Sequence, residues 1–189
     1  MIARNYYYLV ASLPYINYGD KPPFSSTEFL ENCNAMLSPA DASLLQYCCY
    51  DPKIAIETTA STGSAFIDFH MLRERVAALN LAYLRAAKLN RPSPGEPPHD
   101  VPRSEAVAKA AFEMEDPMEA MIYIDRARWG VLDEMVGINY FGVNNIYAYL
   151  LKLRLLERKL HYEVEKGFAV YREVYDTIIN SIPRYKEDR

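Results

Sequence analysis

The C-terminal quarter of the chain carries the longest regular hydrophobic pattern. From Ile146 onward, apolar residues recur mostly three or four positions apart, which places them on one face of a helix with about 3.6 residues per turn. These positions are Leu150, Leu153, Leu160, Val164, Phe168, Tyr171, Tyr175, Ile178 and Ile182. The pattern predicts one long helix over residues 140–182. Its opening segment, Ile146–Leu156, is apolar almost all round, and we therefore expect other helices to enclose it.

A second long helical pattern covers residues 64–90. Its apolar positions are Phe66, Phe69, Leu72, Val76, Leu79, Tyr83 and Leu84. A helix of this length spans about 40 Å, at about 1.5 Å per residue. Two such rods, packed antiparallel with a shorter helix over 117–136, would form a bundle with coiled-coil-like contacts.

Shorter helices are marked by residues that favour a helix start. Ser25 followed by Glu28 fits a capping box. Ser38 precedes Pro39 and Asp41, which combines a cap residue, a proline in the first turn and an acid near the positive helix end. The sequence thus predicts helices after Ser25, from Ser38 to about Cys49, over 104–114 and over 117–136, the last one ending at Gly137.

Two segments lack a decisive pattern. Tyr6–Leu13 is aromatic and aliphatic and fits either a short helix or a short strand. Residues 53–64 are mildly β-like and fit a loop with a helical turn equally well. The rest of the chain is helical in pattern, so the expected fold class is all-α, a helical bundle.

Dense proline marks one break in this bundle. Residues 91–103 are rich in proline, which blocks helix formation and favours an extended connector. We expect a single all-helical domain over 1–189. Within it, the connector either forms a long surface loop or divides the chain into subdomains 1–90 and 104–189.

The bulk composition is that of an ordinary globular protein. The chain has 189 residues, of which 50% are hydrophobic and 24% charged. It has neither an apolar run long enough for a membrane span nor a secretory pattern at its start, so a cytoplasmic location is expected. The net charge of −4 argues against nucleic-acid binding. Cys33, Cys48 and Cys49 are expected to be buried thiols.

No motif for catalysis or cofactor binding occurs. The glycines are scattered, without a Walker, Rossmann or nucleophile-elbow pattern. We therefore expect no catalytic residue, no cofactor and no metal. One alternative stays open, in which His70 with Glu74 and His161 with Glu165 join in a metal-binding bundle. Each of these pairs places two potential ligands one helical turn apart.

Tyrosine is the most unusual part of the composition, with 16 residues. It combines a large ring with a polar tip and is common both in cores and at protein interfaces. The tyrosines of the last helix cannot all face one core, and local packing and an interaction surface are equally good interpretations. The basic residues nearby are interleaved with glutamates, which is typical of a solvated face. The candidate partner interface consists of Tyr140, Tyr147, Tyr149, Lys152, Arg154, Arg158, Lys159 and Tyr162.

Two parts of the chain resemble known families. The first comprises Tyr6–Pro14, Pro22-Pro23-Phe24, Glu28–Glu31 and Leu37–Asp41. It is similar to an uncharacterised bacterial family encoded in operons of V-type (A/V-type) ATP synthases. The second comprises Ile146–Leu151, Glu157 and Glu165-Lys166-Gly167. It resembles the terminal helix of the C/d-type subunit of rotary ATPases, called C in archaeal-type enzymes and d in eukaryotes. There an Ala-aromatic-Leu-Leu step also opens a helix rich in Leu and Glu.

The resemblance implies a non-catalytic role in a rotary ATPase. The C/d-type subunit sits on the membrane rotor ring, seats the central shaft and transmits torque. Its chains are longer and consist of three helical subdomains, so this chain could hold at most part of that arrangement. The expected partners are other V-type ATPase subunits, at the cytoplasmic face of the inner membrane and peripheral to it through protein contacts. An assembly or scaffold protein for the same complex is the alternative.

Overall fold

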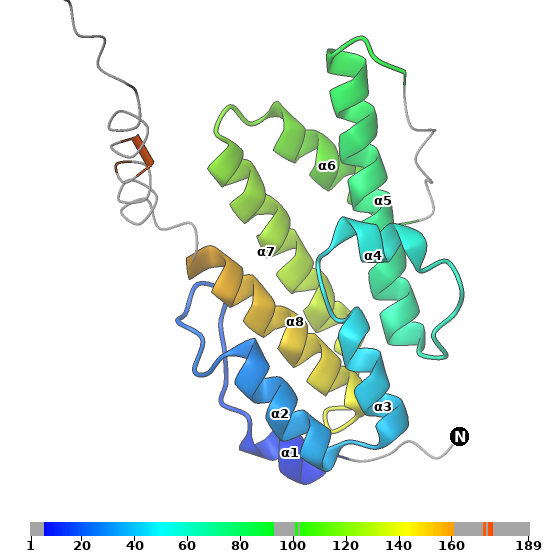
Figure 1. Cartoon of the computed structure of the whole chain (residues 1–189), viewed down its shortest axis with the longest axis vertical. Helices are drawn as coiled ribbons and strands as arrows, with labels where there is room; N and C mark the ends of the chain where they lie inside the picture. The colour runs from blue at the N-terminus through cyan, green and yellow to red at the C-terminus, as the bar shows by residue number, and fades with distance from the viewer. Residues whose placement is uncertain (1–5, 93–100, 102, 161–171, 173, 176–189) are drawn as a thin grey trace, which may run out of the picture.

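The computed structural model describes residues 6–92, 101, 103–160, 172 and 174–175. Within them the chain forms eight α-helices, one 3-10 turn and no strand, so the predicted all-α class is confirmed (Figure 1). None of the helices in this part of the chain is long and apolar enough to cross a bilayer. The elements are α1 (Tyr7–Ser12), α2 (Ser26–Met36), α3 (Pro39–Leu44), the 3-10 turn η1 (Leu45–Tyr47), α4 (Pro52–Glu57), α5 (Ala65–Lys88), α6 (Ser104–Glu113), α7 (Pro117–Val136) and α8 (Val143–Leu160).

The predicted helix starts are confirmed by their capping bonds. The Ser25 hydroxyl accepts from the backbone N–H of Glu28 at 3.1 Å, and the Ser38 hydroxyl accepts from that of Asp41 at 3.2 Å. Gly137 ends α7 with φ at +66°, a conformation that L side chains rarely adopt. The helix after Ser38 is shorter than predicted, because it tightens into η1 before reaching Cys49.

Both segments without a decisive pattern contain helices. Tyr6–Leu13 holds α1 instead of the strand that we considered. The Tyr6 N–H donates to the Phe141 carbonyl at 2.9 Å. No strand among the described residues lies alongside this segment, so it has no partner for a β-ladder. Residues 53–64 include most of α4, which Asp51 caps. The Arg75 side chain of α5 holds α4 in place by donating to the carbonyls of Ala55 and Thr58.

The opening turns of α8 form the centre of the core. Ile146, Tyr147, Leu150, Leu151 and Leu153 have no exposed surface, as predicted for a segment that is apolar almost all round. The core residues around them come from α1, α2, η1, α4, α5 and α7. This one core therefore draws on both sides of the proline-rich segment. The helix begins at Val143, and the part of the predicted rod beyond Leu160 lies outside the described residues, apart from positions 172, 174 and 175.

The three longest helices do not form a simple bundle of parallel rods. Helix α7 packs along α8, as expected, and also against α6. Helix α5 packs chiefly against α4 and α6, and its first turn reaches α8 where the Phe66 and Tyr147 rings lie 6.0 Å apart. Because α6 lies between them, α5 and α7 are separated over their upper halves (Figure 1). This separation creates the site described below.

Replacing Leu153 by Ala tests how much the core depends on the root of α8. The side chain is fully buried, so we expect its truncation to lower the free energy of unfolding by about 3 kcal/mol, through lost burial and the cavity left behind. Leu89→Ala is the control, because Leu89 is 61% exposed and its truncation should change that value by less than about 0.5 kcal/mol. Urea unfolding of both variants measures the difference. Equal losses would contradict the central position of α8.

A cavity with a charged floor between three helices

Helices α5, α6 and α7 border a cavity with a volume of about 830 Å³. Tyr50 and Arg158 contribute to its base. The cavity remains open because the helix faces that meet there carry small side chains, which do not fill the space between the backbones. These small residues are Ala77 and Ala78 of α5, Ala108 and Ala111 of α6, and Ala120 and Ala127 of α7.

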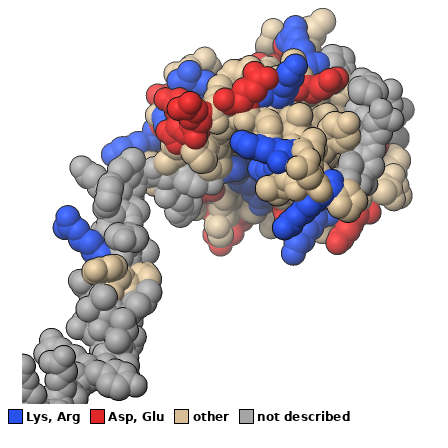
Figure 2. All heavy atoms as spheres, turned by 90° about the horizontal axis from the view of Figure 1, so that it is seen from above, with Lys and Arg blue, Asp and Glu red and all other residues tan. Residues whose placement is uncertain are grey.

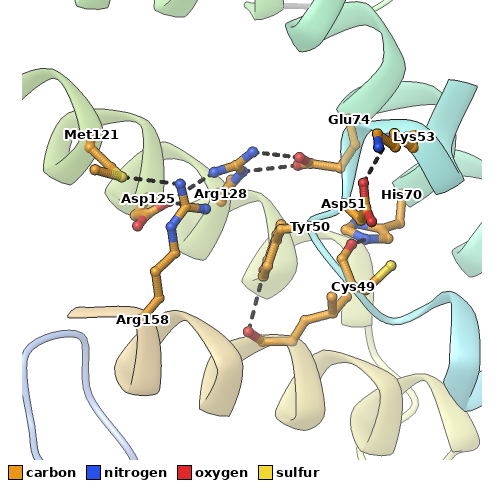
Figure 3. Close-up of polar contacts among 11 residues, drawn as sticks. Cys49, Tyr50, Asp51, Lys53, His70, Glu74, Met121, Asp125, Arg128 and Arg158 are labelled. Carbon is orange, nitrogen blue, oxygen red and sulfur yellow. Dashed lines mark hydrogen bonds and ion pairs between the residues drawn. The ribbon is translucent and has the colours of Figure 1, made fainter. Parts of the chain in front are cut away.

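A cluster of ion pairs lies at the floor of this cavity (Figure 3). Arg128 of α7 donates to both carboxylate oxygens of Glu74 on α5, with N–O distances of 3.0 and 2.5 Å. Its third nitrogen donates to Asp125 at 2.8 Å. Arg158 of α8 approaches the same Asp125 at 3.6 Å, and donates to the sulfur of Met121 at 3.1 Å. The cluster therefore links α5, α7 and α8 through charged side chains.

These charges are held in a largely dry environment. The side chains of Arg128, Glu74 and Asp125 are 19%, 9% and 5% exposed. Burial disfavours the Arg128 cation, but the adjacent carboxylates outweigh that effect and raise the pKa of Arg128 above its usual value. The guanidinium thus stays charged.

Tyr50 joins the charged cluster to the core. Its hydroxyl donates to the Leu151 carbonyl of α8 at 3.3 Å, and the guanidinium carbon of Arg128 lies 4.8 Å from the centre of its ring. The ring also meets the His70 ring edge-on at 5.6 Å. Burial, and after it the nearby Glu74 carboxylate, raise the pKa of Tyr50 well above its usual value, so the phenol stays neutral. Tyr50 is therefore a neutral spacer and hydrogen-bond donor.

His70 is a buried, neutral histidine. Its Nε2 lies 2.9 Å from the Cys49 carbonyl, which can only accept, so this nitrogen carries the proton. Burial lowers the pKa of His70, and the Arg128 and Arg73 charges lower it further, while Glu74 and the bond to Cys49 oppose the shift. The imidazole thus has a structural role in this cluster.

His70 and Glu74, the two described residues of the metal-binding alternative, do not support it. Glu74 is bound to Arg128, and His70 is bound to the Cys49 carbonyl. His161 and Glu165 lie outside the described residues. In the part of the chain that the structure covers, no three His, Cys, Asp or Glu side chains gather in a way that could hold a metal ion.

The tyrosines of the predicted partner interface divide between core and surface. Tyr140 is 67% exposed, as an interface residue requires. Tyr147 has no exposed surface and donates to the Asp41 carbonyl at 3.1 Å, so it belongs to the core and leaves the predicted set. Tyr149 is partly buried, with its hydroxyl on the Pro14 carbonyl at 2.9 Å and its ring 5.3 Å from that of Phe29. Tyr162 lies outside the described residues.

Three of the predicted basic residues are bound within the protein. Lys152 pairs with Asp133 at 2.5 Å and lies 4.9 Å from the centre of the Trp129 ring. Arg154 donates to the Cys48 carbonyl, and Arg158 belongs to the charged cluster. Lys159 is exposed, near the ring of Tyr18. Of these four basic residues, only Lys159 thus fits the solvated face that the sequence predicts.

An exposed aromatic surface lies elsewhere, where α1 meets the turn before α8. Tyr7 packs on Phe141 with ring centres 4.7 Å apart, and Tyr8 lies next to Tyr7 at 5.7 Å. Tyr8 and the turn residues Ile138 and Tyr140 are 83%, 91% and 67% exposed. We call these five residues the α1 aromatic surface. The sequence signals it through the tyrosine run at positions 6–8, but only the fold brings that run to residues 138–141.

Comparisons with known proteins find similarity to one family model over part of the chain. A model of the family described as "Protein of unknown function (DUF2764)" matches residues 104–182. This stretch includes α6, α7 and α8 and therefore one side of the cavity. No curated protein and no solved structure matches the chain.

Glu74→Gln tests the contribution of the charged cluster to stability. The variant keeps the shape of the side chain but leaves the buried Arg128 with one carboxylate fewer, so we expect the free energy of unfolding to fall by about 3 kcal/mol. The matched control is Glu134→Gln, which breaks the pair with Arg103, whose side chains are 65% and 77% exposed. That change should cost less than about 1 kcal/mol in urea unfolding. A similar cost for both variants would refute the importance of the buried cluster.

The lowered pKa of His70 predicts a pH dependence of stability. The unfolded chain takes up a proton below about pH 6.5, whereas the folded protein does so only at a lower pH. Stability should therefore decline as the pH falls through about 6.5, and His70→Gln should remove that part of the decline. Urea unfolding at several pH values between about 8 and 5.5 measures both slopes. Parallel slopes for the two proteins would show that another group is responsible.

Proposed function

We propose that this protein is a non-catalytic subunit of a V-type rotary ATPase that couples the central shaft to the membrane rotor ring. It would act at the cytoplasmic face of the inner membrane, through contacts with the other subunits. The observation that carries the proposal is that the described residues of the two resembling parts, which exclude 165–167, pack together as one unit. That unit surrounds the beginning of α8.

Hydrogen bonds join these segments directly. Tyr149 of α8 donates to Pro14, which ends the first resembling segment, and Tyr147 donates to Asp41, which ends the Leu37–Asp41 segment. Further along α8, Glu157 accepts from the backbone N–H of Ser26 at 2.5 Å and so holds the start of α2. Residues that carry the resemblance thus fix the origin and direction of the last helix.

The physical character of this unit suits a mechanical role. Its centre is a helix root buried on all sides, and close-packed interiors transmit strain because their side chains cannot shift independently. Next to this unit, the buried side chains of Tyr50, His70 and Arg128 bind backbone carbonyls and carboxylates of the protein itself. These observations support a coupling or docking component over a catalyst.

The α1 aromatic surface is the docking face that we assign to the neighbouring subunits. Large exposed aromatic groups are enriched at protein interfaces, and the surface is continuous with the buried root of α8 through Tyr7 and Phe141. A load applied there would reach α8 directly.

Affinity purification from native membranes in a gentle detergent tests the proposal. We expect the wild-type protein to retain ATPase subunits of the shaft and the ring in fixed stoichiometry. The double variant Tyr8→Asp/Tyr140→Asp should lose most of them, at least tenfold, while its melting temperature stays within a few degrees of wild type. Tyr83→Asp is the matched control, because Tyr83 is 42% exposed on α5, away from this surface, and it should retain the partners.

Two results would decide against the proposal. Failure of the wild-type protein to co-purify with any ATPase subunit would overturn it. Recovery with partially assembled complexes only, together with absence from the mature ATPase, would favour the assembly or scaffold protein instead.

A further inference from the structure

We propose that the cavity between α5, α6 and α7 binds a small amphipathic anion, an acid with one negatively charged head and an unbranched aliphatic chain. The head would meet arginines of the cavity, and the chain would lie along the alanine-lined walls. This inference is independent of the proposed place in a rotary ATPase, since it concerns a separate part of the molecule and the isolated protein.

The size and the walls of the cavity fit such a ligand. Its volume of about 830 Å³ falls within the range of about 300–1,000 Å³ that is usual for small-molecule sites. The walls are mostly apolar, with Leu81, Val107, Phe112 and Ile124 beside the alanines. An aliphatic chain placed there loses contact with water at every methylene group, and each buried methylene strengthens binding by about fourfold.

The charges of the cavity favour an acid over a base. Four arginines line it, Arg73, Arg85, Arg128 and Arg158, against the single lining carboxylate of Glu74. Arg128 takes both oxygens of Glu74 and one of Asp125, so these two acids are already bound within the floor. The excess of guanidinium groups leaves a positive potential in the cavity. Figure 2 shows Lys and Arg side chains on this face of the molecule, interspersed with Asp and Glu and beside uncharged residues.

Arg73 and Arg85 lie twelve residues, or about 18 Å, apart along α5, so we assign them as two alternative positions for the head group, one toward each end of the cavity. Arg73 is partly buried and Arg85 is exposed, and neither has an ion-pair partner among the residues that the structure describes. Arg73 instead lies over the Phe69 ring at 5.8 Å. Burial lowers the pKa of Arg73, the more distant Glu74 and Glu134 carboxylates oppose that shift, and the guanidinium stays charged. A guanidinium offers paired N–H donors that match the oxygens of a carboxylate or a phosphate.

Isothermal titration calorimetry of the purified full chain tests the ligand class. The probes are octanoate, decanoate and decyl phosphate, all below their micelle concentrations, with decyltrimethylammonium and inorganic phosphate as controls. We expect saturable one-to-one binding of the acids, at least tenfold tighter for decanoate than for octanoate. We expect none for the cation, and none for inorganic phosphate at the same concentrations. Equal binding of the cation and the acids, or of decyl phosphate and inorganic phosphate, would overturn the proposal.

Two pairs of variants locate the site. Ala78→Phe places a ring in the wall of the cavity and should weaken decanoate binding at least tenfold, whereas Ala86→Phe, also partly buried on α5 but not lining the cavity, should not. The double variant Arg73→Gln/Arg85→Gln should weaken decanoate binding by a similar factor. Arg91→Gln should leave decanoate binding unchanged, because Arg91 is exposed just beyond the end of α5. Circular dichroism establishes that each variant is folded, and Ala120→Phe replaces Ala78→Phe if the latter unfolds. Undiminished binding in the folded cavity variants would overturn the site.

The same experiments distinguish a carboxylate head from a phosphate head, and a free ligand from a membrane lipid. Similar affinities for decanoate and decyl phosphate would indicate recognition of charge and chain alone, whereas a preference for one acid identifies the head. Co-sedimentation with phosphatidylglycerol vesicles adds a third arm. One result would overturn the proposal: wild type and Ala78→Phe bind vesicles equally well, and the wild-type protein does not bind free decanoate. It would mean that a membrane surface holds the protein outside the cavity.

Discussion

The constraint on which this structure depends is the burial of the first turns of α8 on every side. An ordinary surface helix needs one apolar stripe covered. In α8, Ile146 and Leu150 lie on one face and Leu151 and Leu155 on another, and all four lack exposed surface. Covering them requires α1, α2, η1, the start of α5 and α7 at once. The relative positions of these elements, although they are far apart in the sequence, therefore follow from one helix.

Tyrosines provide both ring packing and hydrogen bonds in this buried region. Their rings pack in the core around α8, while their hydroxyls donate to backbone carbonyls: Tyr147 to Asp41, Tyr149 to Pro14, and Tyr50 to Leu151. Among the described residues, no buried side-chain nitrogen or oxygen is left without a hydrogen bond. The high tyrosine content thus reflects internal packing in part, and the α1 aromatic surface accounts for several of the others.

The cavity exists because α5 and α7 pack against different helices. Helix α7 follows α8, and α5 follows α4 and α6, so the two long helices diverge above the point where Glu74 meets Arg128. Alanine on the facing sides leaves the space between them open. The charged cluster closes the floor, because at that point the helices are near enough for side chains to pair.

Local signals in the sequence determined the helices themselves. Caps at Ser25 and Ser38, the stop at Gly137 and the apolar turns after Ile146 could all be predicted, because each depends on neighbours within a few residues. Only the tertiary structure decided that Tyr6–Leu13 is helical, that Tyr147 is buried rather than exposed, and that Glu74 and Arg128, 54 positions apart, form an ion pair. These outcomes depend on which helix faces meet, and that choice is made by the packing of the whole chain around α8.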